Sequence, residues 1–256
     1  MRQKRYEMSD EQWEQIKDLF PKTKTGCPPK DKRLMFNAIL WLARSGSALR
    51  DLLECFGSWK TVYSRFCKWR DDDTPFNIFH ALNAEADYEN LSIDSTSVKA
   101  HQHSAGAKNG AVNYKVNQHI GRSRGGNTTK IHAIVDGLGN PIYFALTAGS
   151  EHDCVCALDL LSKVNIEGSN ILADKAYGSL KIREYITLQK ASYTIPPKSN
   201  AKEKWEYDKW LYIERHLIEY FLNKIKHFRK LATRYDKLAT YFLAFIYCAA
   251  IFILCK

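Results

Sequence analysis

Disulfides, a secretory leader and a zinc-binding cysteine set are all missing from this sequence. Its seven cysteines are odd in number and irregular in spacing, so they do not form a disulfide framework. Cys154 and Cys156 lack a second pair that would complete a zinc site, and we expect them to pack in a core. The first residues, Met-Arg-Gln-Lys-Arg, lead into a polar helix rather than an apolar signal segment. We therefore expect a reduced, cytoplasmic protein.

Charge is missing from residues 238–255, which form an apolar segment near the C-terminus. The segment reaches the minimum length of a membrane-spanning helix, and basic residues precede it. It is nevertheless short, and it contains Thr240 and two tyrosines. We predict a buried terminal helix that packs on a sheet, and no membrane partner. A membrane-anchored protein is the alternative, and it would partition with detergent.

Acidic residues are missing between Asp94 and Asp136, in a protein whose net charge is +10. Residues 91–256 carry 23 basic and 14 acidic side chains, whereas residues 1–90 carry 15 and 14. The basic excess favours a polyanionic partner. The basic residues in the stretch without acids belong either to a solvated loop or to a loop that faces phosphate. They are Lys99, Lys108, Lys115, Arg122, Arg124 and Lys130.

Three acidic residues are candidates for a metal site. Asp94 lies in one apolar, strand-like run, Asp174 ends another, and Glu219 lies in a helical pattern near the C-terminus. A carboxylate at the end of a buried strand is costly unless a cation pairs with it. If the three converge, they suit a two-metal phosphoryl-transfer site. We interpret Asp136 as a turn residue and Asp153 as a helix N-cap.

The first ninety residues predict a helical region. Ser9 and Gln12 form a capping-box pattern ahead of a helix that Pro21 ends. Apolar spacing predicts four further helices. They run from Asp31 to Ser45, from Leu49 to Phe56, from Trp59 to Trp69, and around 76–87.

The helix that follows the tight turn at residues 56–59 has one apolar stripe. Lys60, Arg65 and Lys68 lie off this stripe. This arrangement fits a helix-turn-helix whose second helix enters the major groove of DNA. The nearly neutral charge of the region fits equally well a small helical bundle with solvated lysines.

From residue 90 onward, strand-like and helical segments alternate. Their order matches an α/β ribonuclease-H-like fold with a mixed five-stranded sheet. We predict a helical DNA-binding domain at residues 1–88 and a ribonuclease-H-like catalytic domain with a C-terminal helix at residues 89–256. The predicted strands are 91–98, 130–136, 141–147, 170–174 and 192–196, and the predicted helices are 153–164, 179–190 and 211–230.

Four polar residues share one face of the predicted helix 211–230. Tyr212, Arg215, Glu219 and Lys226 follow one another at helical spacing, and apolar side chains occupy a different face. Such a helix could present an acid to a metal and two cations to phosphate. An exposed salt bridge between Arg215 and Glu219 is the simpler alternative.

The spacing Tyr212-x2-Arg215-x3-Glu219-x6-Lys226 resembles the Y-(2)-R-(3)-E-(6)-K signature of bacterial insertion-sequence DDE transposases. The resemblance is to the insertion-sequence-four/five superfamily, and within it to the insertion-sequence-five branch. It extends over nearly the whole chain. Residues 94–101, 129–141 and 172–178 are similar to the first-aspartate strand, the central hairpin and the second-aspartate turn, and residues 50–69 to the N-terminal helical domain.

The resemblance implies a DNA transposase. Such an enzyme binds the terminal inverted repeats of an insertion sequence, cleaves at the element ends and joins the 3′-hydroxyls to target DNA. Asp94, Asp174 and Glu219 would hold two Mg²⁺ ions, for which Mn²⁺ is a possible substitute.

The resemblance also implies DNA contacts and an assembly. Arg215 and Lys226 would bind phosphates near the scissile bond, and Tyr212 would pack against a displaced base or orient a phosphate. A homodimer on double-stranded DNA is expected, in the nucleoid-associated cytoplasm. Two alternatives stay open: a ribonuclease-H-like nuclease that cuts without joining, and an inactive DNA-binding remnant.

Overall fold

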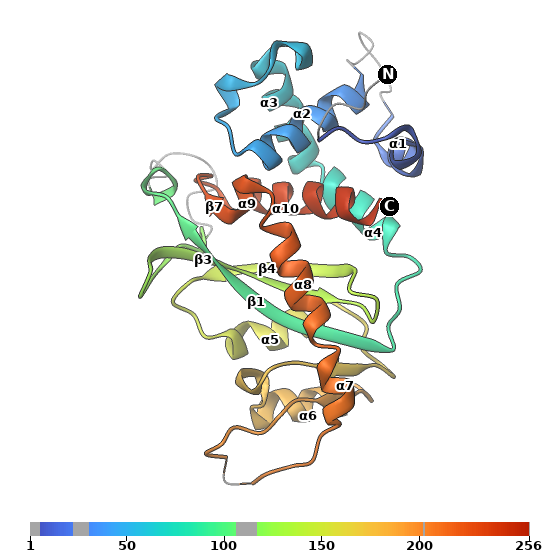
Figure 1. Ribbon diagram of the computed structural model, residues 1–256, viewed down its shortest axis with the longest axis vertical. Helices are drawn as coiled ribbons and strands as arrows, with labels where there is room; N and C mark the ends of the chain where they lie inside the picture. Colours follow the sequence, from blue (N-terminus) through green and yellow to red (C-terminus); the bar gives the residue numbers. More distant parts are fainter. Residues whose placement is uncertain (1–5, 23–30, 106–116, 202, 256) are drawn as a thin grey trace. The chain divides into compact units, whose positions relative to one another are not determined.

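The computed structural model describes residues 6–22, 31–105, 117–201 and 203–255 (Figure 1). The chain divides into two compact units. The sheet unit comprises residues 85–100 and 117–224. The helical unit comprises residues 1–84, 101–116 and 225–256, so its parts come from both ends of the sequence.

Predicted caps begin and end the first helices of the helical unit. The capping box at α1 is confirmed: the Gln12 N–H donates to Ser9 Oγ at 3.2 Å, and the Ser9 N–H donates to Gln12 Oε1 at 3.0 Å. The second helix begins after its N-cap Asp31 and ends at Gly46, whose φ of +69° is the left-handed conformation that glycine adopts most easily. The helices are α1 (Asp10–Ile16), α2 (Lys32–Ser45), α3 (Trp59–Asp71) and α4 (Thr74–Leu82).

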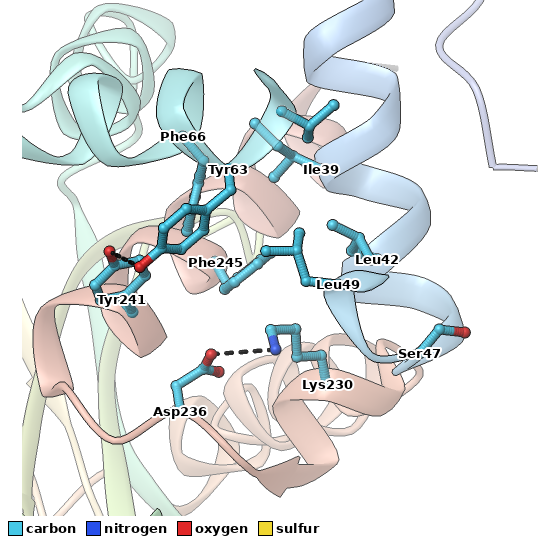
Figure 2. Close-up of a pocket in the computed structure, with 11 residues that line it drawn as sticks. Ile39, Leu42, Ser47, Leu49, Tyr63, Phe66, Lys230, Asp236, Tyr241 and Phe245 are labelled. Carbon is cyan, nitrogen blue, oxygen red and sulfur yellow. Dashed lines mark hydrogen bonds and ion pairs between the residues drawn. The ribbon is translucent and has the colours of Figure 1, made fainter. Parts of the chain in front are cut away.

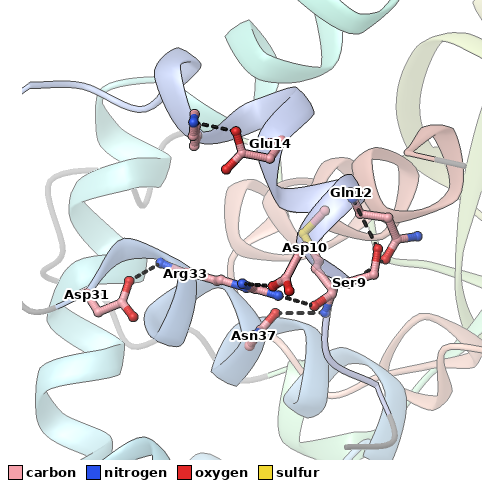
Figure 3. Close-up of polar contacts among 9 residues, drawn as sticks. Ser9, Asp10, Gln12, Glu14, Asp31, Arg33 and Asn37 are labelled. Carbon is pink, nitrogen blue, oxygen red and sulfur yellow. Dashed lines mark hydrogen bonds and ion pairs between the residues drawn. The ribbon is translucent and has the colours of Figure 1, made fainter. Parts of the chain in front are cut away.

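Polar contacts connect α1 to its neighbours (Figure 3). Arg33 of α2 donates to Asp10 Oδ1 at 2.5 Å and to the carbonyl oxygen of Met8 at 2.8 Å. Gln12 Nε2 donates to the carbonyl oxygen of Cys255 at 2.6 Å. The N-terminal helix is therefore bonded both to the next helix and to the far end of the chain.

The segment between α2 and α3 differs from its prediction. Instead of one helix over 49–56, it forms two single-turn 3-10 helices, η2 (Leu49–Asp51) and η3 (Glu54–Phe56). Leu52 and Leu53 between them have extended backbones, with ψ of 135° and 140°. Eight residues make about two turns, which is too short for a stable helix unless packing supports it. Leu53 lacks such support because it is exposed.

The C-terminal helix α10 (Ala239–Leu254) packs on α2, α3 and α4, and follows α9 (Arg229–Ala232) and β7 (Thr233–Arg234). It is buried, as predicted, but its neighbours are helices of its own unit. The chain therefore divides differently from the predicted domains 1–88 and 89–256. A helix that is apolar on all sides can be enclosed by any apolar surface, so its sequence does not specify a partner. Within the described part of the chain, no helix has both the length and the apolar character needed to cross a membrane.

A small pocket of about 60 Å³ lies within the helical unit (Figure 2). Side chains of α2, η2, α3 and α10 make most of its wall apolar. Its polar groups are the ion pair between Lys230 Nζ and Asp236 Oδ1, at 3.1 Å, and the hydroxyls of Tyr63 and Tyr241, 2.8 Å apart. The pocket is therefore an imperfectly filled part of an apolar core.

The sheet unit has the predicted mixed sheet. The strand order is β2-β3-β1-β5-β6, and β4 pairs with β3. β1, β3 and β4 are antiparallel, whereas β5 runs parallel to β1 and β6 runs parallel to β5. All five predicted strands are present, and β2 is an addition. The strands are β1 (Asn90–Ala100), β2 (Gly121–Ser123), β3 (Gly126–Val135), β4 (Pro141–Ala148), β5 (Asn170–Leu172) and β6 (Ser192–Thr194).

Helices cover both faces of this sheet. Leu91, Ile93 and Ile134 pack against α5 (Asp153–Ser162) and α6 (Leu180–Leu188), in a core that also contains Cys156. Phe144 of β4 instead contacts Phe221 of α8 (His216–Ile225), with ring centroids 5.8 Å apart. Figure 1 shows α8 running across the sheet.

The predicted helix 211–230 is interrupted. It forms α7 (Lys209–Ile213) and α8, with Glu214 and Arg215 in a turn between them. The Arg215 N–H donates to the Tyr212 carbonyl at 3.2 Å, and the Leu217 N–H to the Glu214 carbonyl at 3.0 Å. These tighter i to i+3 bonds break the α-helical register just before α8.

Candidate active site

Asp94 lies on β1, and Asp174 lies just beyond the end of the neighbouring parallel strand β5. Ser92 pairs with Leu172 in the β1–β5 ladder, and each aspartate follows two residues later. Continuing this register sets the two aspartates side by side on one face of the sheet, because side chains alternate along a strand. Asp174 lies just beyond β5, where its Oδ1 accepts the Ala176 N–H at 2.7 Å and caps η5 (Lys175–Tyr177).

The Asp94 carboxylate is largely buried, with 22% of its side chain exposed. Its Oδ1 accepts the Ser95 N–H at 2.7 Å, and its Oδ2 accepts a hydrogen bond from Arg215 Nη1 at 2.9 Å. Burial raises the pKa of Asp94 above its ordinary value, and the charge of Asp174 acts in the same direction. The Ser95 N–H and Arg215 oppose this rise in pKa. Added positive charge would therefore stabilise the ionised pair of aspartates.

Arg215 connects Asp94 to Glu219. While Nη1 bonds to Asp94, Nη2 forms an ion pair with Glu219 Oε1. Glu219 lies in α8 with half of its side chain exposed, and the adjacent Ile218 is fully buried. The salt bridge proposed as the simpler alternative therefore exists, and the same arginine also reaches the first aspartate. Among the residues that the structure describes, no three Asp, Glu, His or Cys side chains form a group that could hold a metal ion.

The donor set nevertheless suits a divalent cation. All three candidates are carboxylates, and Mg²⁺ and Mn²⁺ prefer hard oxygen ligands. The Arg215 guanidinium is itself a cation held between Asp94 and Glu219. The position between these two carboxylates thus favours positive charge, and Arg215 provides it in this structure.

Tyr212 and Lys226 lie on separate segments from Glu219. Tyr212 belongs to α7, is half-buried, and has its ring centroid 5.8 Å from Arg215 Cζ. Lys226 follows the last residue of α8 and is half-buried. The four motif residues therefore lie on α7, on the turn at residues 214–215, on α8 and just after α8, instead of on the single continuous face that was predicted.

The other predicted DNA contacts differ in exposure. Lys130 is engaged within the sheet unit: its Nζ donates to the Glu151 carbonyl at 2.7 Å and pairs with Asp153 Oδ1 at 3.0 Å. Lys108 and Lys115 lie outside the described residues. Arg65 is half-buried, and Lys60, Lys68, Lys99, Arg122 and Arg124 are exposed.

Asp153 has a position that the sequence did not reveal. It is the first residue of α5 rather than the predicted N-cap, which is His152. Its Oδ1 accepts hydrogen bonds from Ser95 Oγ at 2.8 Å and from Lys130 Nζ. Ser95 and Lys130 lie inside predicted strands, and polar residues there indicate a buried polar partner. Nothing in the sequence shows which residue that partner is. Asp136 does form the predicted turn, since its Oδ1 accepts the Leu138 and Asn140 N–H groups.

Aspartates on adjacent parallel strands, with a glutamate on a later helix, define the class of DDE phosphoryl transferases. Residues 85–237 match the family model "Transposase DDE domain", and residues 8–79 match "Putative transposase of IS4/5 family". The chain therefore belongs to the DDE transposase family and, within it, to the IS4/5 group, so the resemblance found in the sequence is confirmed. It is a DNA transposase, and this family membership implies an enzyme that uses a divalent metal and acts on DNA.

Two bacterial proteins are similar to parts of the chain. "Putative transposase for insertion sequence element IS6501" of Brucella ovis is 38% identical over 123 residues, which are 48% of this chain and 94% of that protein. "Uncharacterized protein y4sN" of Sinorhizobium fredii is 43% identical over 104 residues, which are 40% of this chain and 82% of that protein.

Solved transposase complexes are more distant. The piggyBac transposase synaptic complex with hairpin DNA is 11% identical, with a TM-score of 0.41, over 75% of this chain and 47% of that one. The chain therefore spans about half the length of that transposase. A pre-cleavage Mos1 transpososome is also 11% identical, with a TM-score of 0.30, over 92% of this chain and 81% of that one.

Proposed function

We propose that this transposase binds the terminal inverted repeats of an insertion sequence, cleaves at the element ends, and joins the freed 3′-hydroxyls to target DNA. One observation carries the proposal. Asp94 lies on β1, Asp174 lies two residues beyond the end of the adjacent parallel strand β5, and Arg215 links Asp94 to Glu219.

In this proposal the carboxylates of Asp94, Asp174 and Glu219 hold two Mg²⁺ ions, with Mn²⁺ as a substitute. When bound, the cations activate the attacking oxygen and stabilise the leaving oxygen of an in-line displacement. In cleavage, water adds to phosphorus as the bond to the 3′ oxygen breaks, which leaves a 3′-hydroxyl and a 5′-phosphate. In joining, that hydroxyl attacks a target phosphodiester, and the target's own 3′ oxygen leaves. No side chain becomes bonded to phosphorus in either step.

The DNA contacts in this proposal are basic and aromatic side chains. Arg215 and Lys226 bind phosphate near the scissile bond, and Tyr212 packs against a base or orients a phosphate. The exposed residues Lys99 and Arg122, on β1 and β2, add positive charge in the sheet unit. Two transposon ends must be processed together, so the proposed assembly is a homodimer on DNA within the nucleoid.

The proposal is tested by cleavage of DNA that carries the element ends and flanking sequence. We expect activity from the wild-type chain with Mg²⁺, and a loss of more than about 100-fold in Asp94→Asn, Asp174→Asn and Glu219→Gln, since each acid would help to hold a cation that contributes several kcal/mol of charge stabilisation. Glu214→Gln is the matched control, because Glu214 is an exposed acid in the turn before α8 and should leave activity unchanged.

A second assay separates the alternatives. Wild-type protein that cleaves the ends but never joins them to a target plasmid would be a nuclease rather than a transposase. Equal cleavage activity in wild type and Asp94→Asn would show that Asp94 does not belong to the metal site. Binding to the inverted repeats without any cleavage would identify an inactive remnant.

A further inference from the structure

Behind Asp94, on the opposite face of the sheet, lies a polar cluster that the proposed reaction does not use. Ser95 follows Asp94 in β1, so its side chain points to the other face. There its Oγ donates to Asp153 Oδ1 at 2.8 Å. Asp153 belongs to α5, the helix that covers this face, and 28% of its side chain is exposed.

The cluster joins three separate elements. Asp153 accepts from Ser95 on β1 and pairs at 3.0 Å with Lys130 on β3. Lys130 also donates to the Glu151 carbonyl, just before α5. The aspartate charge is therefore neutralised by a lysine that bonds to the chain on both sides of His152. These contacts fix the start of α5 against β1 and β3.

Tyr177 extends the cluster toward the second aspartate. It is the last residue of η5, the turn that Asp174 caps, and it is 1% exposed. Burial raises the pKa of Tyr177, and the charges of Asp153, Asp94 and Asp174 act in the same direction. Tyr177 is therefore a buried phenol in the turn that Asp174 caps.

One hydrogen bond connects this cluster to the candidate active site. The Ser95 N–H donates to Asp94 Oδ1, while Asp94 Oδ2 is directed to the cation that Arg215 provides. Asp153 holds the Ser95 side chain, and Ser95 holds one oxygen of Asp94. Ser95 thus contacts the candidate active site through its backbone N–H and the cluster behind the sheet through its hydroxyl.

We propose that Asp153 is a positioning residue for the metal site: through Ser95 it fixes the Asp94 carboxylate, although it does not itself face the DNA or the metal. The inference rests on the proposed function. Residues that orient a metal ligand from behind usually change metal affinity or activity 10- to 100-fold when they are replaced. Asp153 also lies in the first turn of α5, where the positive end of the helix dipole stabilises an acidic side chain. A purely stabilising role must therefore be distinguished from positioning.

The test measures Mn²⁺ binding to the full-length protein by calorimetry, without DNA, and single-turnover cleavage with Mg²⁺. Asp153→Asn keeps an acceptor for Ser95 but loses the ion pair, whereas Asp153→Ala loses both. We expect Mn²⁺ affinity and cleavage rate to fall by roughly 3- to 10-fold in Asp153→Asn and by roughly 10- to 100-fold in Asp153→Ala. Both variants should keep wild-type affinity for end DNA in the absence of metal.

Asp159→Asn is the matched control. Asp159 lies on the same helix but is exposed, and it pairs with Lys163 at 3.9 Å. We expect wild-type Mn²⁺ affinity in this variant. A double-mutant cycle of Asp153→Ala with Ser95→Ala should be non-additive, because both substitutions remove the hydrogen bond between Ser95 Oγ and Asp153 Oδ1.

The outcomes separate this inference from the proposed function. If wild type binds Mn²⁺ and cleaves DNA, and folded Asp153→Asn and Asp153→Ala do the same with unchanged constants, Asp153 has no positioning role. If Asp153→Ala fails to fold, Asp153→Asn decides, and wild-type constants in that variant overturn the inference. If wild type binds Mn²⁺ through Asp94 but does not cleave, the proposed function fails, whereas Mn²⁺ affinity still tests Asp153.

Discussion

The two units fill their interiors with different kinds of side chain. Large aromatic residues, such as Trp69, Phe79 and Phe242, are fully buried in the helical unit. The core between the sheet and α5 and α6 consists mainly of leucine, isoleucine and alanine. Both units contain buried polar residues: Asn37 and Arg234 in the helical unit, and Thr128 and His132 in the strands of the sheet unit.

The difference follows from geometry. Branched side chains such as isoleucine fit the half-buried surface of a pleated sheet, whereas each aromatic ring of the helical unit buries a large apolar area. The helical unit therefore depends on a few large side chains for its stability. The sheet unit holds polar groups beside its chemistry, and it should respond to pH and charge more strongly than to the loss of a single ring.

The largest expected effect tests the helical unit. Phe242 of α10 is fully buried, so Phe242→Ala should lower the free energy of unfolding by about 3–5 kcal/mol, through lost burial and the cavity left behind. Urea denaturation followed by helical circular dichroism measures the change. Leu243→Ala, at the neighbouring half-buried position, is the control and should cost clearly less. Equal losses at both positions would contradict the importance assigned to the rings.

The next largest expected effect is the dependence of the stability of the sheet unit on pH. Burial lowers the pKa of His132 from 6.5 to about 4, with Lys130 acting in the same direction and Asp153 opposing it. Between pH 4 and pH 6.5 the unfolded chain therefore binds the proton more tightly, so stability falls as the pH drops through this window. The contribution is at most about 3 kcal/mol.

Urea denaturation of wild type and His132→Gln at pH 4.5 and pH 7 measures this contribution. Glutamine keeps a hydrogen-bonding group for Thr147 Oγ1, which lies 2.8 Å from His132 Nε2, but it does not titrate. We expect the variant to lose less stability on acidification than wild type. Identical losses would show that His132 does not carry the pH dependence.

The smallest effect concerns Arg215, the cation between two of the acids. If it also contacts phosphate, Arg215→Gln should reduce the slope of log affinity for end DNA against log salt concentration by about 0.9, the change expected for one phosphate contact. Fluorescence anisotropy at several salt concentrations measures the slope. Lys163→Gln removes an equal charge from the exposed end of α5 and should leave the slope unchanged. Equal changes in both variants would indicate net charge rather than a specific contact.

Local patterns were sufficient to predict much of the fold. The capping box at Ser9, the stop at Gly46 and all five strands depend on neighbouring residues, and all of them are present. The sequence also suggested Asp94, Asp174 and Glu219 as candidates, because Asp94 lies in one apolar run, Asp174 ends another and Glu219 lies in a helical pattern. The side-by-side placement of the two aspartates needed the β1–β5 register, which is a long-range property.

The remaining features depend on contacts that spacing does not encode. Helical periodicity continues through Glu214 and Arg215, so the break there was not predictable from the pattern. The sequence of α10 did not indicate which elements pack against it, because this helix lacks a polar face. Asp153 meets Ser95 across 58 positions of sequence, and no local signal connects them.

The discontinuous make-up of the helical unit has a consequence for dissecting the protein. The rings of Phe66 and Phe79 lie against Phe245, at 4.4 Å, and Tyr247, at 5.1 Å, which are contributed by the opposite end of the polypeptide. A fragment that stops after α4 would leave these faces open to water and would tend to aggregate. The helical unit is therefore not a detachable module, and shortening the gene from its 3′ side would disrupt this unit before it reached the acids.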